Sequence, residues 1–267
     1  MLDNVASFLP EVLLLSIALL TLLLGVFGFA NSAKLPIFSA VLLISLSGFM
    51  LIYDSGSITW LKILLLMFAV LALYLRQFAY TEQSFEYIPL LLFSCFAGFI
   101  IISAKDFLSL FMGLELQSLA AYILTGVLGK VSQNDKQSYC LSAEAGIKYF
   151  SLGAISTCLM LFGISLIYGI NNSISYSALS VGKLESFAVI LILLSFLFKL
   201  AAAPMHMWLP DVYQGSSIFS LNIFISVNKL SALIGLNNLL MDVFNQPGLL
   251  IIIDKLLITS MILSLCV

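Results

Sequence analysis

Long apolar stretches recur along the whole chain and are separated by short polar connections. Splitting the sequence at prolines, glycines and clusters of charge gives about nine stretches, each long enough to cross a bilayer core of about 30 Å as a helix. They cover residues 10–29, 36–53, 60–78, 88–103, 106–129, 142–169, 186–213, 217–243 and 248–267. The longest polar connections, 76–87 and 130–140, are too short for a soluble domain. The pattern predicts an all-α, polytopic transmembrane bundle that forms a single membrane domain over residues 1–267.

The composition supports the same conclusion. Of the 267 residues, 62% are apolar and 9% are charged, whereas about a quarter of the residues in a soluble domain are charged. So few charges could not cover the surface of a soluble domain of this size, so we expect lipids to surround the chain. The net charge of −2 gives no sign of a nucleic-acid partner. The four cysteines are scattered without a CxxC pair, which indicates neither a metal site nor a disulfide.

The basic residues of the connections suggest an orientation. Lys34, Arg76, Lys130 and Lys136 fall on one side of the predicted bundle, and Lys62, Lys105 and Lys183 fall on the other. By the positive-inside rule, this distribution predicts that the N-terminus lies outside, in the periplasm or intermembrane space.

Most charged residues lie in connections or at helix ends, where snorkelling accounts for them. We interpret Lys62 as such an anchor. Glu11 and Asp106 fit the preference of helix N-termini for negative charge.

A second group of charges lies inside the apolar stretches. A charge at mid-helix costs about 2.5–3.5 kcal/mol on insertion scales. Glu115, Lys199 and Lys229 stand in three separate stretches. We interpret them as groups that carry protons along one path, and we expect Glu115 and Lys199 to approach each other. Static interhelical ion pairs are the alternative. Lys148 follows Glu144 at i+4, so these two side chains share a face and can form a pair with a secondary role.

A helix break is predicted next to Lys199. Pro204 and Pro210 stand six residues apart in AAAPMHMWLPDVYQGSS, and each proline removes a backbone donor. Irregular backbone at membrane depth is tolerated only where it faces protein or a wet cavity. His206, the single histidine, lies in this segment and could relay protons, although a structural role is as plausible for it. Lysine suits proton transfer because burial shifts its pKa readily, whereas arginine stays charged.

Several of these motifs resemble a known family. LELQSLAAYIL, SAEAGIKYFSLGAIS and FKLAAAPMHMWLPDVYQGS are similar to segments of NADH dehydrogenase subunit 2, an antiporter-like membrane subunit of respiratory complex I. The resemblance implies the antiporter-like fold with a broken seventh helix. It places the family's fifth-helix glutamate at Glu115, its seventh-helix lysine at Lys199 and its eighth-helix lysine at Lys229. The sixth-helix pair falls on Glu144 and Lys148.

The resemblance also implies a function. We expect a subunit of the proton-translocating NADH:ubiquinone reductase that contributes to proton transfer but holds no cofactor or metal itself. NADH, FMN, the Fe–S clusters and ubiquinone would belong to other subunits. The expected location is the mitochondrial inner membrane, with the bacterial plasma membrane as the alternative. The competing interpretations are a subunit of a multisubunit Na⁺/H⁺ antiporter or membrane-bound hydrogenase, and a purely structural membrane subunit.

Two departures from the family pattern stand out. After Tyr213 the family usually reads EGAPTPV, whereas this chain reads QGSSIFSLN, which lacks the charge and the prolines of that pattern. The chain also stops before the last lysine of the family. We therefore expect other membrane-arm subunits as partners, and a second hydrophobic polypeptide that supplies the missing C-terminal helices.

Overall fold

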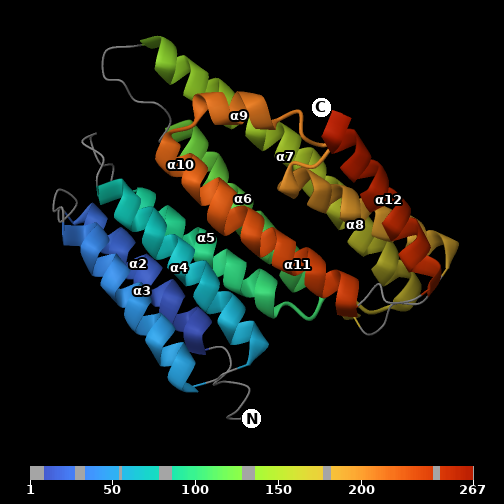
Figure 1. The fold of residues 1–267 in the computed structure, drawn as a ribbon, viewed down its shortest axis with the longest axis horizontal. Coiled ribbons are helices and arrows are strands. Elements are labelled where there is room, and N and C mark those ends of the chain that lie inside the picture. The colour runs from blue at the N-terminus through green and yellow to red at the C-terminus, as the bar shows by residue number, and fades with distance from the viewer. Residues whose placement is uncertain are drawn as a thin grey trace.

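The computed structural model describes residues 9–27, 34–53, 56–77, 86–127, 136–176, 182–242 and 247–266. Within these ranges nearly every residue is helical, and the β-pairing is limited to an isolated bridge between Asp106 and Ser175. The long helices run side by side (Figure 1). The predicted all-α bundle is confirmed.

The helices follow the apolar stretches of the sequence closely, and the expected break in the seventh stretch is present. Their bounds are α2 Leu9–Val26, α3 Lys34–Tyr53, α4 Ser57–Gln77, α5 Tyr87–Ser103, α6 Phe107–Val127, α7 Lys136–Asn171, α8 Lys183–Leu200, α9 Leu209–Gly215, α10 Ile218–Ile223, the π-helical turn η3 Phe224–Asn228, α11 Lys229–Asp242 and α12 Pro247–Cys266.

Five helical stretches among the described residues are long and apolar enough to cross a membrane. They are Leu9–Val26, Ser57–Leu75, Phe107–Gly126, Cys140–Asn171 and Ile218–Met241, and two shorter apolar helices cover Pro36–Leu51 and Tyr87–Ser103. The number of nine spans therefore stays a prediction. The orientation does too, because Lys130 and the side chains of Lys34, Arg76 and Lys136 lie outside the described residues.

Helix α5 lies at the centre of one half of the bundle. Its sequence, YIPLLLFSCFAGFIIIS, has no charged residue and is apolar on every face, as is typical of a buried helix. It packs against α2, α4, α6 and α11, and Leu91, Cys95 and Phe99 on it are fully buried. The other half is built on α7 and α8, which pack against each other, and α12 lies against α8 (Figure 1).

Glycines allow α6 and α7 to approach at backbone distance. A Cβ atom built on Gly146 would lie 2.9 Å from the Cα atom of Gly126 and 3.2 Å from its nitrogen. About two turns further along α7, a Cβ atom on Gly153 would overlap the hydroxyl of Tyr122. Small residues at the crossing of two membrane helices permit this kind of contact.

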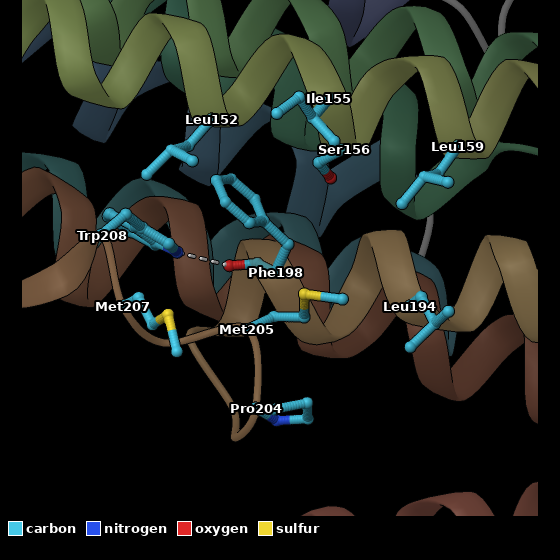
Figure 2. A pocket seen from close by; sticks show the side chains of 10 residues that line it. All are labelled: Leu152, Ile155, Ser156, Leu159, Leu194, Phe198, Pro204, Met205, Met207 and Trp208. Atoms are coloured by element: carbon cyan, nitrogen blue, oxygen red, sulfur yellow. Dashed lines mark hydrogen bonds between the residues drawn. The ribbon is translucent and has the colours of Figure 1, made fainter.

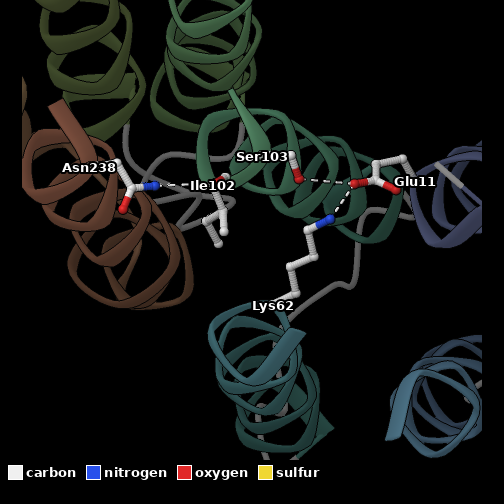
Figure 3. Close-up of polar contacts among 5 residues, drawn as sticks. All are labelled: Glu11, Lys62, Ile102, Ser103 and Asn238. Atoms are coloured by element: carbon white, nitrogen blue, oxygen red, sulfur yellow. Dashed lines mark hydrogen bonds and ion pairs between the residues drawn. The ribbon is translucent and has the colours of Figure 1, made fainter. Parts of the chain in front are cut away.

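A buried ion pair joins the N-terminal helices to α5 (Figure 3). The Nζ atom of Lys62 on α4 contacts Oε1 of Glu11 on α2, and the Ser103 hydroxyl at the end of α5 donates to the same oxygen at 3.1 Å. The side chains of Lys62 and Glu11 are 6% and 9% exposed. Next to Ser103, the Asn238 amide of α11 donates to the carbonyl of Ile102 at 3.2 Å. The interpretation of Lys62 as a snorkelling anchor is therefore wrong, because its ammonium group points to a buried carboxylate.

Asp106 behaves as a helix-terminal acid. Its Oδ1 atom accepts a hydrogen bond from the backbone N–H of Ser109 at 2.6 Å, which satisfies a free donor at the start of α6. The predicted place of Asp106 at a helix N-terminus is confirmed.

Replacing Gly146 by alanine should destabilise the bundle, because the new methyl group meets the backbone of Gly126 rather than a flexible side chain. Overpacking of this kind costs about 1–3 kcal/mol. Gly169→Ala, in the same helix, is the matched control: no atom lies within 4 Å of the added Cβ, and the gain in helix propensity is up to about 1 kcal/mol. Denaturant titration of the purified protein in detergent, followed by circular dichroism, measures both. Equal midpoints for the two variants would contradict the expected contact.

Lys62→Met should destabilise the protein by about 3–5 kcal/mol, because it leaves the buried Glu11 carboxylate without a counter-charge. The double variant Glu11→Gln/Lys62→Met removes both charges and should recover most of that loss. The same titration applied to both single variants and to the double variant gives the coupling energy. Simple addition of the two single losses would show that the two residues do not stabilise the fold as a pair.

Candidate functional site

The seventh apolar stretch is interrupted between α8 and α9. Helix α8 ends at Leu200, and residues 201–208 form an irregular segment before α9 begins at Leu209. Pro204 lacks the N–H that a continuing helix would need, whereas Pro210 lies in the first turn of α9, where helices tolerate proline. The break predicted from the two prolines is confirmed.

The end of α8 closes with a left-handed residue. Ala201 has φ of 57°, and the backbone N–H groups of Ala201 and Ala202 donate to the carbonyls of Phe198 (3.0 Å) and Leu197 (2.9 Å). Glycine usually fills this position, because an L-residue with a Cβ atom is strained there. The chain therefore accepts local strain to turn sharply directly after Lys199.

Two side chains donate further hydrogen bonds to carbonyls at the break. The indole N–H of Trp208 donates to the carbonyl of Phe198 at 3.1 Å (Figure 2), and the Ser260 hydroxyl of α12 donates to the carbonyl of Ala203 at 2.6 Å. Trp208 is held in turn by Tyr149 of α7, which stacks on it with ring centroids 4.6 Å apart. The irregular segment is thus fixed to α7, α8 and α12.

A cavity of about 140 Å³ lies beside this segment, between α7 and α8. Figure 2 shows Leu152 and Ile155 of α7 on one side of it and Pro204 and Met205 of the irregular segment on the other. No charged residue lines the cavity. It is an apolar feature next to the break and does not contain the predicted proton-carrying residues.

Lys199 is the second-last residue of α8 and stands directly before the break. Its Nζ atom is buried and has no hydrogen-bond partner among the described residues. The Glu115 carboxylate of α6 interacts with it electrostatically, so the structure brings the two residues into one region but not into a direct ion pair. Glu115 is half-buried, and the Ser118 hydroxyl donates to its Oε2 atom at 3.3 Å.

Lys229 is the first residue of α11 and follows the π-helical turn η3. Its Nζ atom lies 5.9 Å from the ring centroid of Tyr213 on α9, a cation–π contact. The hydroxyl of Tyr213 is buried and has no hydrogen-bond partner in the described part of the chain. Sequence reasoning placed Lys229 in a helix interior but did not find Tyr213, which stands in the specific PDVY motif.

Lys148 bridges two carboxylates at the surface. Its Nζ atom lies 2.8 Å from Glu144 one turn before it and 2.8 Å from Asp211 on α9. The expected pairing of Glu144 with Lys148 is confirmed. Asp211 was missed, although it also belongs to the PDVY motif. Because Lys148 is 45% exposed, this cluster ties α9 to α7 rather than forming part of a buried charge path.

His206 lies within the irregular segment. Its Nδ1 atom is buried without a hydrogen-bond partner among the described residues. No hydrogen bond or ion pair in the described ranges joins it to Lys199 or Lys229. Across the same ranges, no three His, Cys, Asp or Glu side chains gather in a group that could hold a metal ion.

Known proteins are similar to this chain in sequence. Residues 104–267 match the family described as "NADH:quinone oxidoreductase/Mrp antiporter, TM". NADH-quinone oxidoreductase subunit N of Orientia tsutsugamushi is 32% identical over 98% of this chain and 58% of its own length. The subunit N of Rhodobacter capsulatus is 33% identical over 90% of this chain and 54% of its own length. The chain thus spans little more than half the length of these relatives.

Solved structures show the same fold. A chain of respiratory complex I from Thermus thermophilus superposes with a TM-score of 0.71 at 25% identity, covering 85% of this chain and 52% of that one. A chain of the Mrp complex from Dietzia gives 0.70 at 19% identity over 90% of this chain and 49% of its own length. With the family match covering more than half of its residues, the chain belongs to the NADH:quinone oxidoreductase/Mrp antiporter transmembrane family.

Proposed function

We propose that this chain is a membrane-arm subunit of a proton-translocating NADH:quinone oxidoreductase. In this proposal Glu115, Lys199 and Lys229 carry protons across the membrane, while other subunits transfer electrons from NADH to ubiquinone. The observation that carries the proposal is the buried Nζ atom of Lys199, which has no hydrogen-bond partner in the part of the chain that the structure describes, stands next to a helix break and interacts with Glu115. The relatives named NADH-quinone oxidoreductase subunit N support it.

The residue types suit reversible proton transfer. A buried ammonium group releases its proton more readily as it loses water, and holds the proton more firmly when a carboxylate approaches. Glu115 and Lys199 are coupled but not locked in a direct ion pair, so a small displacement changes the balance between these two effects. A static ion pair, which is the structural alternative, would gain most from direct contact.

Unpartnered polar atoms surround the break and extend the path. The Nζ atom of Lys199, the Nδ1 atom of His206 and the Oη atom of Tyr213 are all buried without a protein partner among the described residues. Leaving such atoms unsatisfied is costly, and ordered water commonly satisfies them. We propose that water along the irregular segment links Lys199 to Tyr213 and Lys229, with His206 in a secondary role. The exposed Glu144–Lys148 pair holds α9 in place through Asp211.

The partners and the location follow from the same relatives. The relatives are named subunit N, so we propose that this chain is a counterpart of subunit N. The motifs suggest subunit 2, which is a narrower identification. Since the relatives are bacterial, they favour a bacterial plasma membrane over the mitochondrial inner membrane. Other membrane-arm subunits would be its partners.

Lys199→Ala should uncouple proton translocation from NADH oxidation in the assembled complex. We expect the number of protons moved per NADH to fall to about half or less, because a membrane-buried ionisable group of this kind is functional by default. Proton uptake and NADH oxidation are measured together in inverted vesicles, and native gels measure assembly. Lys183→Ala is the matched control, since Lys183 lies at the exposed start of the same helix.

A normal proton-to-NADH ratio in assembled Lys199→Ala complexes would contradict the proposal. Loss of assembly with a normal ratio in the remaining complexes would favour a purely structural subunit. A sodium gradient that drives proton movement without NADH would favour an antiporter subunit instead.

A further inference from the structure

The helix that carries Lys229 contains one turn that is wider than an α-helical turn. Between α10 and α11, η3 spans Phe224–Asn228, and the backbone N–H of Lys229 reaches the carbonyl of Phe224. A π-helical turn is uncommon and occurs frequently at functional sites. Neither proline nor glycine lies within η3, so local backbone preference does not explain it.

One hydrogen bond from the neighbouring helix α5 and one from α11 itself act on the end of this turn. The Ser94 hydroxyl of α5 donates to Oδ1 of Asn228, the last residue of η3, at 2.6 Å. The Ser231 hydroxyl donates to the backbone carbonyl of the same Asn228 at 3.0 Å. Both the side chain and the carbonyl of the residue before Lys229 are therefore held.

Gln117 of α6 completes the arrangement. Its amide nitrogen lies 2.8 Å from the Ser231 hydroxyl, to which it donates, and 3.4 Å from the carbonyl of Ser94. Gln117 is 4% exposed, and Ser94 and Ser231 are fully buried. The network joins α5, α6 and the Lys229 helix in a part of the bundle that excludes solvent, where satisfied polar contacts specify a unique arrangement.

The wide turn determines where Lys229 points. Each residue of a helix turns the chain by about 100°, so removing the extra residue of a π turn would rotate everything after it by about that angle. A regular α-helical turn in place of η3 would therefore rotate Asn228 and Lys229 together relative to α10, and the contacts of Asn228 with Ser94 and of Lys229 with Tyr213 would change together.

We propose that Asn228 and Gln117, through Ser94 and Ser231, are positioning residues that keep η3 open and hold Lys229 against Tyr213. None of these four side chains titrates near neutral pH, so they fix the position of Lys229 without carrying protons themselves. This inference rests on the proposed function of Lys229.

The test uses the assembled complex and compares Ser94→Ala with Ser94→Thr. Ser94→Ala removes the hydroxyl with little change in volume, and it should lower the proton-to-NADH ratio about twofold or more, as expected when a buried charge loses its position. Ser94→Thr keeps the hydroxyl and should retain the normal ratio. Asn228→Leu should lower the ratio as Ser94→Ala does, whereas Asn237→Leu, at an exposed position of the same helix, should leave it unchanged.

A structure of the Ser94→Ala complex gives an independent result. We expect a regular α-helical turn in place of η3 and an Nζ atom of Lys229 that no longer lies over the Tyr213 ring. A normal ratio in Ser94→Ala, or an unchanged η3 and Lys229, would overturn the inference. Lys229→Ala separates the two claims: a normal ratio in that variant contradicts the proposed function, whereas a low ratio in Lys229→Ala beside a normal ratio in Ser94→Ala contradicts the positioning role alone.

Discussion

Within a bilayer, the protein itself has to satisfy each backbone carbonyl that a helix break releases, and this constraint governs the site around Lys199. The indole N–H of Trp208 donates to the carbonyl of Phe198, and the hydroxyl of Ser260 donates to the carbonyl of Ala203. Both donors come from outside α8, so the break exists only together with the packing that surrounds it. Because Tyr149 of α7 stacks on Trp208, the position of this indole donor also depends on α7.

The two buried lysines differ in how far the protein satisfies their charge. In the buried Lys62–Glu11 pair, the ammonium group and the Ser103 hydroxyl both contact Oε1 of Glu11, and the pair holds helices together. The Nζ atom of Lys199 is also buried but has no hydrogen-bond partner among the described residues. Two lysines of one protein thus illustrate two uses of a membrane-buried cation. The paired one holds helices together, and in the proposed function the incompletely satisfied one exchanges its proton.

Local patterns in the sequence were enough to predict much of this fold. The lengths of the apolar stretches predicted the positions of the helices, and Pro204 with Pro210 predicted the break. Both features can be recognised in a short segment of sequence, without knowledge of tertiary contacts. The Glu144–Lys148 pair was found for the same reason. Glu11 and Lys62 were missed as partners because 51 residues separate them, and each had a sufficient explanation at its own helix end. The hydrogen bonds around Asn228 could not be predicted from the sequence. Serine and amide side chains are common in apolar helices, and only the tertiary packing shows which of them meet.

The seven residues of α9 connect the surface of the molecule to its interior. Asp211 and Tyr213 stand two positions apart, so their side chains leave the helix in nearly opposite directions. One meets Lys148 at the surface, and the other meets Lys229 inside. Because both contacts belong to one short helix, a rotation of α9 about its axis would change the outer ion pair and the inner cation–π contact together, so the two are geometrically linked.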